Sequence, residues 1–69
     1  MALIKVIEVI ASSPVSVADA IRQAVAEVSK TVRNVDSVEV KSIKATVANG
    51  EVATFDVIVH ISFRVDSRD

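Results

Sequence analysis

The stretch Val47-Ala48-Asn49-Gly50-Glu51-Val52 decides the fold of this 69-residue chain. Asn49-Gly50 lies between two runs rich in β-branched residues. This pair favours the two-residue type I′ turn, because both of its residues tolerate the positive φ that the turn requires. The sequence therefore predicts a hairpin of two antiparallel strands, over about residues 36–48 and 51–65.

The two strands of this hairpin differ in regularity. After the turn, apolar odd-numbered residues from Phe55 to Val65 alternate with mostly polar even-numbered residues, as in a strand with one buried face. Before the turn the alternation changes phase, since Val38 and Ile43 have opposite parity although both are apolar. A strand changes parity only through a bulge or a bend, so we expect one near Lys41-Ser42.

The residues before the hairpin predict one strand and one helix. Residues 3–11 read LIKVIEVIA, which is typical of a strand covered on both faces, and Pro14 ends it. Apolar residues then recur at helical spacing over about residues 17–33. Ser16 is expected to cap this helix, with Asp19 returning the bond in a capping box. Asn34 is the expected stop.

The element order is strand, helix, strand, strand, which predicts a single α+β domain over residues 1–69. A right-handed crossover makes the first strand parallel to the second. The third strand therefore fits between them and is antiparallel to both. We expect a three-stranded antiparallel sheet in the order first, third, second (1-3-2), with the helix on one face.

Composition excludes several classes of protein. A net charge of −1 leaves no basic surface for nucleic acid, and the absence of cysteine excludes disulfides and thiolate metal sites. No apolar run approaches the roughly 18 residues of a membrane span. The first residues lack the basic segment of a secretion signal, so a soluble cytoplasmic protein is expected, with neither nucleic acid nor membrane as a partner.

Size and hydrophobicity together predict self-assembly. Hydrophobic residues make up 51% of the chain. Domains below about 70–80 residues usually need disulfides, a metal or oligomerisation for stability. A strand of about eleven residues spans roughly 36 Å, whereas a compact chain of this length has a radius of gyration of about 11 Å. The strands should overhang the helix, and neighbouring copies are expected to cover them.

No catalytic or metal site is predicted. Asp56, His60 and Ser62 share one strand face, but successive residues on such a face are about 7 Å apart, beyond hydrogen-bond reach. His60 with Asp56 would give a metal only two of the usual three or four ligands. His60 is therefore interpreted as a polar residue that contacts solvent or a neighbouring subunit. The protein is not expected to be an enzyme, and a ligand site at a subunit interface is the alternative.

Two segments carry a family resemblance: KVIEVIASSPVSVADAIRQAVAEVSKTVRNVDSVEVKSI at residues 5–43 and VIVHISFRV at 57–65. Together with the Asn49-Gly50 hairpin, they resemble the dodecins, small flavin-binding proteins, over about residues 4–65. The resemblance implies a subunit whose sheet partly wraps its helix, assembled as a hollow homododecamer of cubic 23 symmetry. It also implies flavin, riboflavin or FMN, bound in pairs at two-fold interfaces and stored or buffered there.

The same resemblance implies a flavin site that departs from the family pattern. Its residues here would be Val35, Asp36, Ser37, Lys44 and Asp56. Ser37 stands where flavin-binding relatives typically carry a stacking tryptophan, and Asp56 where they carry a glutamine that hydrogen-bonds the ring edge. Lys44, and likewise the basic Arg64, could contact the phosphate of the flavin tail.

Two functions therefore stay open at this stage. Losing an aromatic stack costs about 1–3 kcal/mol, so flavin would bind roughly 5- to 150-fold more weakly. The first function is flavin binding and buffering at this weakened site. The alternative is a flavin-independent shell with a structural role, or one that binds another ligand or a cation through carboxylates repeated by symmetry.

Overall fold

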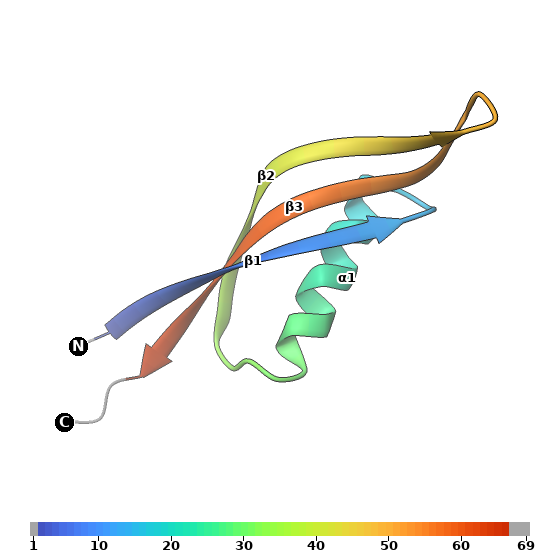
Figure 1. Ribbon diagram of the computed structural model, residues 1–69. Helices are drawn as coiled ribbons and strands as arrows, with labels where there is room; N and C mark the ends of the chain where they lie inside the picture. Colours follow the sequence, from blue (N-terminus) through green and yellow to red (C-terminus); the bar gives the residue numbers. More distant parts are fainter. Residues whose placement is uncertain (1, 67–69) are drawn as a thin grey trace.

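The computed structural model describes residues 2–66, which form one curved sheet with one helix on its inner side (Figure 1). The elements are β1 (Ala2–Ser13), α1 (Val17–Ser29), β2 (Val35–Ala48) and β3 (Glu51–Asp66). β3 is central and antiparallel to both neighbours, in the order β1-β3-β2. This confirms the predicted α+β class and strand order. Residues 1 and 67–69 of the predicted domain lie outside the described residues.

The hairpin between β2 and β3 has the predicted geometry. Asn49 and Gly50 take φ angles of 54° and 77°, and Ala48 pairs with Glu51 across the turn. The predicted irregularity is also present, because the pairing of β2 with β3 shifts between Val40 and Ser42. Two further shifts, at Val35/Ser37 and Thr46/Val47, were not predicted. Together the shifts let β2 bend, as Figure 1 shows.

The start of α1 confirms the predicted cap but not the capping box. The Ser16 hydroxyl accepts a hydrogen bond from the Asp19 N–H at 2.9 Å. The Asp19 carboxylate, however, accepts from the hydroxyl of Ser13 and from the amide of Gln23, both at 2.6 Å, and the Ser16 N–H donates to Ser13 instead. Aspartate is one methylene shorter than the glutamate of a capping box. Its carboxylate bonds to the Ser13 hydroxyl and does not reach the Ser16 N–H.

The predicted helix end at residue 33 is wrong, since α1 ends at Ser29. The N–H groups of Lys30 and Thr31 bond back to carbonyls three residues earlier, which tightens the final turn. Thr31 and Val32 are β-branched and disfavour further helix. Asn34 takes a left-handed φ of 62° and leads the chain into β2, so it acts as a turn residue beyond the helix rather than as its stop.

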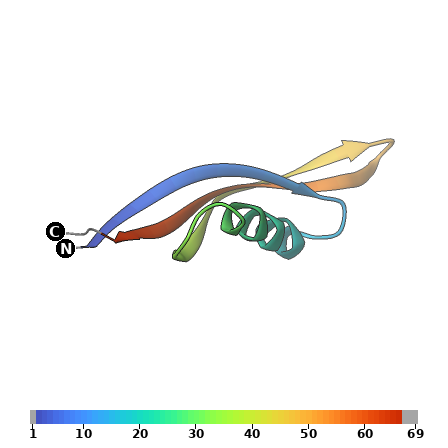
Figure 2. The ribbon, with the colours of Figure 1, turned by 90° about the horizontal axis from the view of Figure 1, so that it is seen from below.

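The core is a thin layer between α1 and β3. Ala20 and Ala24 are the buried helix residues, and their small side chains let α1 lie close to the sheet. The buried apolar residues of the strands are Val57, Val59 and Ile61. Figure 2 shows the helix under the curved sheet, whose opposite face carries no second layer.

The strands overhang this core, as expected from their length. The described residues extend over 57 × 20 × 13 Å with a radius of gyration of 14.4 Å, well above the roughly 11 Å of a compact chain of this size. From Glu39 to its end at Ala48, β2 is exposed on both faces. The large exposed hydrophobic residues are Leu3, Ile4, Val6, Ile10, Val15, Val40, Ile43, Val47 and Val52. Among residues 2–66, no helix is long and apolar enough to cross a membrane.

Candidate ligand site

The candidate site lies on the sheet face opposite α1. Side chains alternate between the faces of a strand, so Asp56 and Ile58 point away from the helix while Val57 and Val59 face it. Residues paired across antiparallel strands share a face. Asp56 is paired with Ser12 of β1 on one side and with Lys44 of β2 on the other. The strand pairing therefore brings three polar residues from three strands into one row.

A cluster of hydroxyl groups surrounds the carboxylate of Asp56. Ser12 Oγ donates to Asp56 Oδ1 at 2.6 Å, and Thr54 Oγ1 donates to the same oxygen at 3.0 Å. Thr46 Oγ1 donates to Oδ2 at 2.6 Å. We call Asp56 and these three hydroxyl residues the Asp56 cluster. It joins all three strands of the sheet.

The cluster keeps Asp56 ionised. The hydrogen bond from Ser12, followed by that from Thr46, lowers the pKa of Asp56 below its usual range, and Thr54 and the nearby charge of Lys44 act in the same direction. Within residues 2–66, Lys44 makes no ion pair with a carboxylate. Its exposed ammonium group is thus free to meet a ligand beside the Asp56 carboxylate.

A pocket of about 390 Å³ opens over the Asp56 cluster. Its floor is apolar, because Ile10 and Ile58 are paired neighbours on this face. Its other lining residues are Ser12, Ser42, Lys44, Thr46, Thr54 and Asp56. An apolar floor with a polar end suits a flat ring that carries polar groups on one edge.

Three of the five residues predicted from the sequence lie on this face. Ser37, Lys44 and Asp56 all face away from α1, whereas the Val35 side chain packs against the core. Asp36 is the extra residue at the shift between Val35 and Ser37, and it is exposed.

One chain does not bring Ser37 and Asp56 together. Ser37 is paired with Ser62, six residues along β3 from Asp56, which corresponds to roughly 20 Å. This distance exceeds the length of a flavin ring system. A flavin that contacts both positions must therefore take one from each of two copies of the chain.

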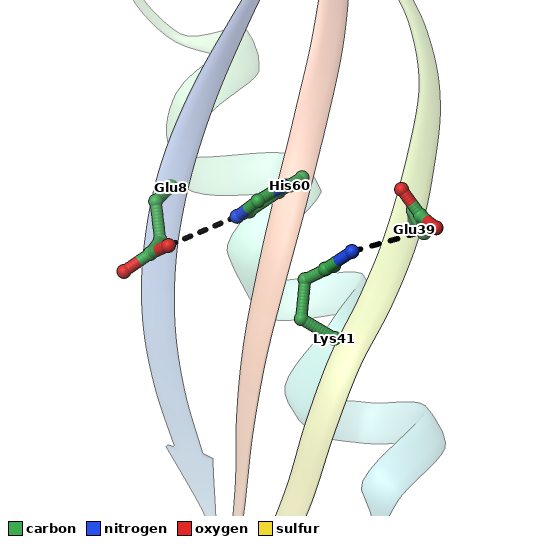
Figure 3. Close-up of polar contacts among 4 residues, drawn as sticks. All are labelled: Glu8, Glu39, Lys41 and His60. Carbon is green, nitrogen blue, oxygen red and sulfur yellow. Dashed lines mark hydrogen bonds and ion pairs between the residues drawn. The ribbon is translucent and has the colours of Figure 1, made fainter.

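His60 has a partner that sequence reasoning missed. Its Nε2 lies 2.9 Å from Glu8 Oε1 on β1, and Lys41 Nζ lies 3.9 Å from Glu39 on β2 (Figure 3). Glu8 and Glu39 both pair with His60 in the sheet register. Asp56 bonds instead to hydroxyls, so Asp56 and His60 belong to separate networks. Residues 2–66 contain no group of three His, Asp or Glu side chains placed to hold a metal.

The hydroxyl residues of the cluster were also missed. Ser12 is more than thirty residues from Thr46 and Thr54 in the sequence, and no spacing pattern connects the three. The signal that could have found them is the strand order: once β3 is placed between β1 and β2, residue 56 must have a neighbour on each side. Their exact identity as partners depends on register, which the three shifts in β2 hide.

The fold and this polar sheet face define a class of small β-α-β-β subunits with an uncovered sheet. Residues 3–66 match the Dodecin family model. The chain is 32% identical over 62 residues to the dodecin of Thermus thermophilus, covering 90% of each chain. The chain belongs to the dodecin family.

Solved structures agree with this assignment. The dodecin of Streptomyces coelicolor is 33% identical, with 97% of this chain and 96% of that chain covered and a TM-score of 0.91. A calcium dodecin of Mycobacterium tuberculosis, described as calcium-chelating with a novel calcium-binding site, is 25% identical, with 97% and 96% covered and a TM-score of 0.80. The backbone is thus shared with a relative that is described as binding calcium.

Proposed function

We propose that this protein binds riboflavin or FMN at weakened sites between copies of the chain in a homododecamer. Its role is to store and buffer the flavin in the cytoplasm, and it is not an enzyme. The observation that supports this most is the placement of Ser37, Lys44 and Asp56 on one uncovered sheet face, with a pocket beside Lys44 and Asp56. Family membership supports the same function.

Assembly is part of the proposal because one chain cannot supply the whole site. The roughly 20 Å along β3 between the rows of Ser37 and Asp56 requires a second copy. The exposed apolar residues on both faces of the sheet give that copy a surface to cover. In this arrangement the flavin ring lies between sheets of two subunits, and Lys44 is a cation available to the flavin phosphate.

The missing aromatic ring sets the affinity. Ser37 is exposed and offers a hydroxyl in place of a π-face, and the chain contains no tryptophan. A lost stack of about 1–3 kcal/mol corresponds to a site roughly 5- to 150-fold weaker. The expected behaviour is reversible buffering of flavin rather than tight retention.

The test is a fluorescence titration of the purified assembly with riboflavin and FMN, beside Ser37→Trp. Because the chain has neither tryptophan nor tyrosine, the variant also reports binding through a single indole per subunit. We expect weak quenching of flavin by the native protein and binding tighter by about 5- to 150-fold in the variant.

The matched control is Ser37→Leu, which adds apolar area at the same position without a π-face. It should recover little of the gain. Equal gains from leucine and tryptophan would show that Ser37 does not stand where a flavin ring stacks. No binding by the native protein or by Ser37→Trp would refute flavin as the ligand.

A second candidate function is a flavin-independent shell that binds a cation, favoured by one observation. A structural relative is described as calcium-chelating, and the Asp56 cluster gathers carboxylate and hydroxyl oxygens of the kind that hard cations prefer. The Lys44 charge beside it opposes this. Calorimetric titration with Ca²⁺ separates the two: heat that saturates in the native protein and disappears in Asp56→Asn would favour the cation.

A further inference from the structure

The Asp56 cluster presents hydrogen-bond acceptors to the pocket, while the other two polar lining residues, Ser42 and Lys44, can donate. A hydroxyl group has one proton and two lone pairs. In Ser12, Thr46 and Thr54 that proton is directed to the Asp56 carboxylate. Each of these oxygens can therefore only accept a hydrogen bond from a bound molecule.

The carboxylate has the same character. An ionised carboxylate accepts about four hydrogen bonds and donates none. Two hydroxyls occupy Oδ1 and one occupies Oδ2, which leaves an acceptor site on Oδ2. The Asp56 cluster is thus an acceptor-only wall built from three strands. Lys44 and Ser42, on the neighbouring strand, supply donors beside it.

We propose that this pocket selects a flat heterocycle that presents adjacent N–H donors, with a carbonyl next to them, on the edge that meets Asp56. The edge of 2-amino-4-oxopteridines (pterins) has this pattern. Its ring N–H and amino group face the cluster, its carbonyl faces Lys44, and its rings lie on Ile10 and Ile58. The inference goes beyond the proposed function, since it names a different ring system as the preferred ligand of this pocket.

The pyrimidine edge of a flavin fits the Asp56 cluster less well than the edge of a pterin does. Its one N–H lies between two carbonyl oxygens, so binding it brings carbonyl acceptors against the acceptors of Ser12, Thr46 or Asp56. When two acceptors face each other, each gives up its hydrogen bond to water and gains none in exchange. A glutamine amide would supply the missing donor, and an aspartate cannot. Asp56 is in this view a specificity-determining residue.

The test uses two ligands of the same ring system that differ only at C2 and at the protonation of N1. Pterin carries an amino group where lumazine, a 2,4-dioxopteridine, carries a carbonyl, and lumazine has the flavin-like edge. Both are fluorescent and are titrated against the assembled protein at a slightly acidic pH where both are uncharged. We expect the native protein to prefer pterin by about tenfold or more, as one hydrogen bond to a charged group allows.

Variants assign the preference to the cluster. Asp56→Asn should abolish it, and Asp56→Gln should favour lumazine and riboflavin. Glu51→Gln, at an exposed position beside the hairpin turn, removes an equal charge and should leave the preference unchanged.

Equal affinities in the native protein, a preference for lumazine, or binding of neither pteridine would overturn the inference, as would a preference that survives Asp56→Asn. Riboflavin binding is measured separately. Failure of riboflavin to bind the native protein and Ser37→Trp counts against the proposed function, whatever the two pteridines do.

Discussion

Replacing one of two matched isoleucines with alanine tests whether neighbouring copies cover the sheet. Ile61 and Ile43 both lie on the face of the sheet that meets α1, paired with Val38 and Val57 respectively. Ile61 is 0% exposed in the single chain, whereas Ile43 is 60% exposed. Alanine also lowers β-propensity at both sites, so that cost largely cancels in the comparison.

The expected loss of stability on Ile43→Ala differs between the single chain and the assembly. Ile→Ala removes three carbons, and at about 0.8 kcal/mol each a fully buried side chain loses about 2.4 kcal/mol. The cavity at Ile61 raises its cost into the range of about 2–5 kcal/mol. At Ile43 the 60% exposure in the single chain would reduce the transfer loss to about 1 kcal/mol. If a neighbouring copy buries Ile43, the transfer loss rises to about 2.4 kcal/mol or more.

The assay is urea unfolding followed by far-ultraviolet circular dichroism, at one chain concentration for all variants. We expect Ile43→Ala to cost more than 2 kcal/mol per chain, close to Ile61→Ala. A cost near 1 kcal/mol or less for Ile43→Ala, beside a normal cost for Ile61→Ala, would refute the view that this end of β2 is covered.

Two further outcomes follow from the hairpin and from the Asp56 cluster. Gly50→Ala should destabilise the protein by about 1–2 kcal/mol through backbone strain alone, because φ is +77° and an added Cβ meets no atom within 4 Å; an unchanged urea midpoint would contradict this. Hydrogen bonds from Ser12 and then Thr46 lower the pKa of folded Asp56, so its ionised form stabilises the fold above the unfolded pKa of about 4. That contribution is lost as pH falls through the lower folded pKa. Native protein should therefore lose more stability than Asp56→Asn on acidification below about pH 4, and parallel pH profiles of the unfolding midpoint would show that the hydroxyl bonds do not favour the ionised form.

The fold was predictable because local signals and the crossover rule agreed. Asn49-Gly50 defined the hairpin, and the parity change placed the central bulge between Val40 and Ser42, where the structure has it. The end of α1 was less predictable, since apolar spacing continues through Val32. There the tight final turn and the β-branched pair after Lys30 outweigh amphipathic periodicity.

The site was predictable only in part. Three of the residues named from family resemblance, Ser37, Lys44 and Asp56, share a face because Lys44 pairs with Asp56 and Ser37 pairs with Ser62, an even number of residues away on β3. The hydroxyl groups around Asp56 depend on register across three strands, which periodicity along one strand does not contain. A site that contains both Ser37 and Asp56 would require a second copy, and a single sequence carries no direct signal for that geometry.

Static light scattering on the native protein, after dilution, tests the central claim most directly: the proposed flavin site is complete only where copies of the chain meet. We expect a particle of about 89 kDa, twelve chains of 7.4 kDa each. Folded particles of 7.4 kDa, with the circular dichroism of the native sheet, would contradict the account.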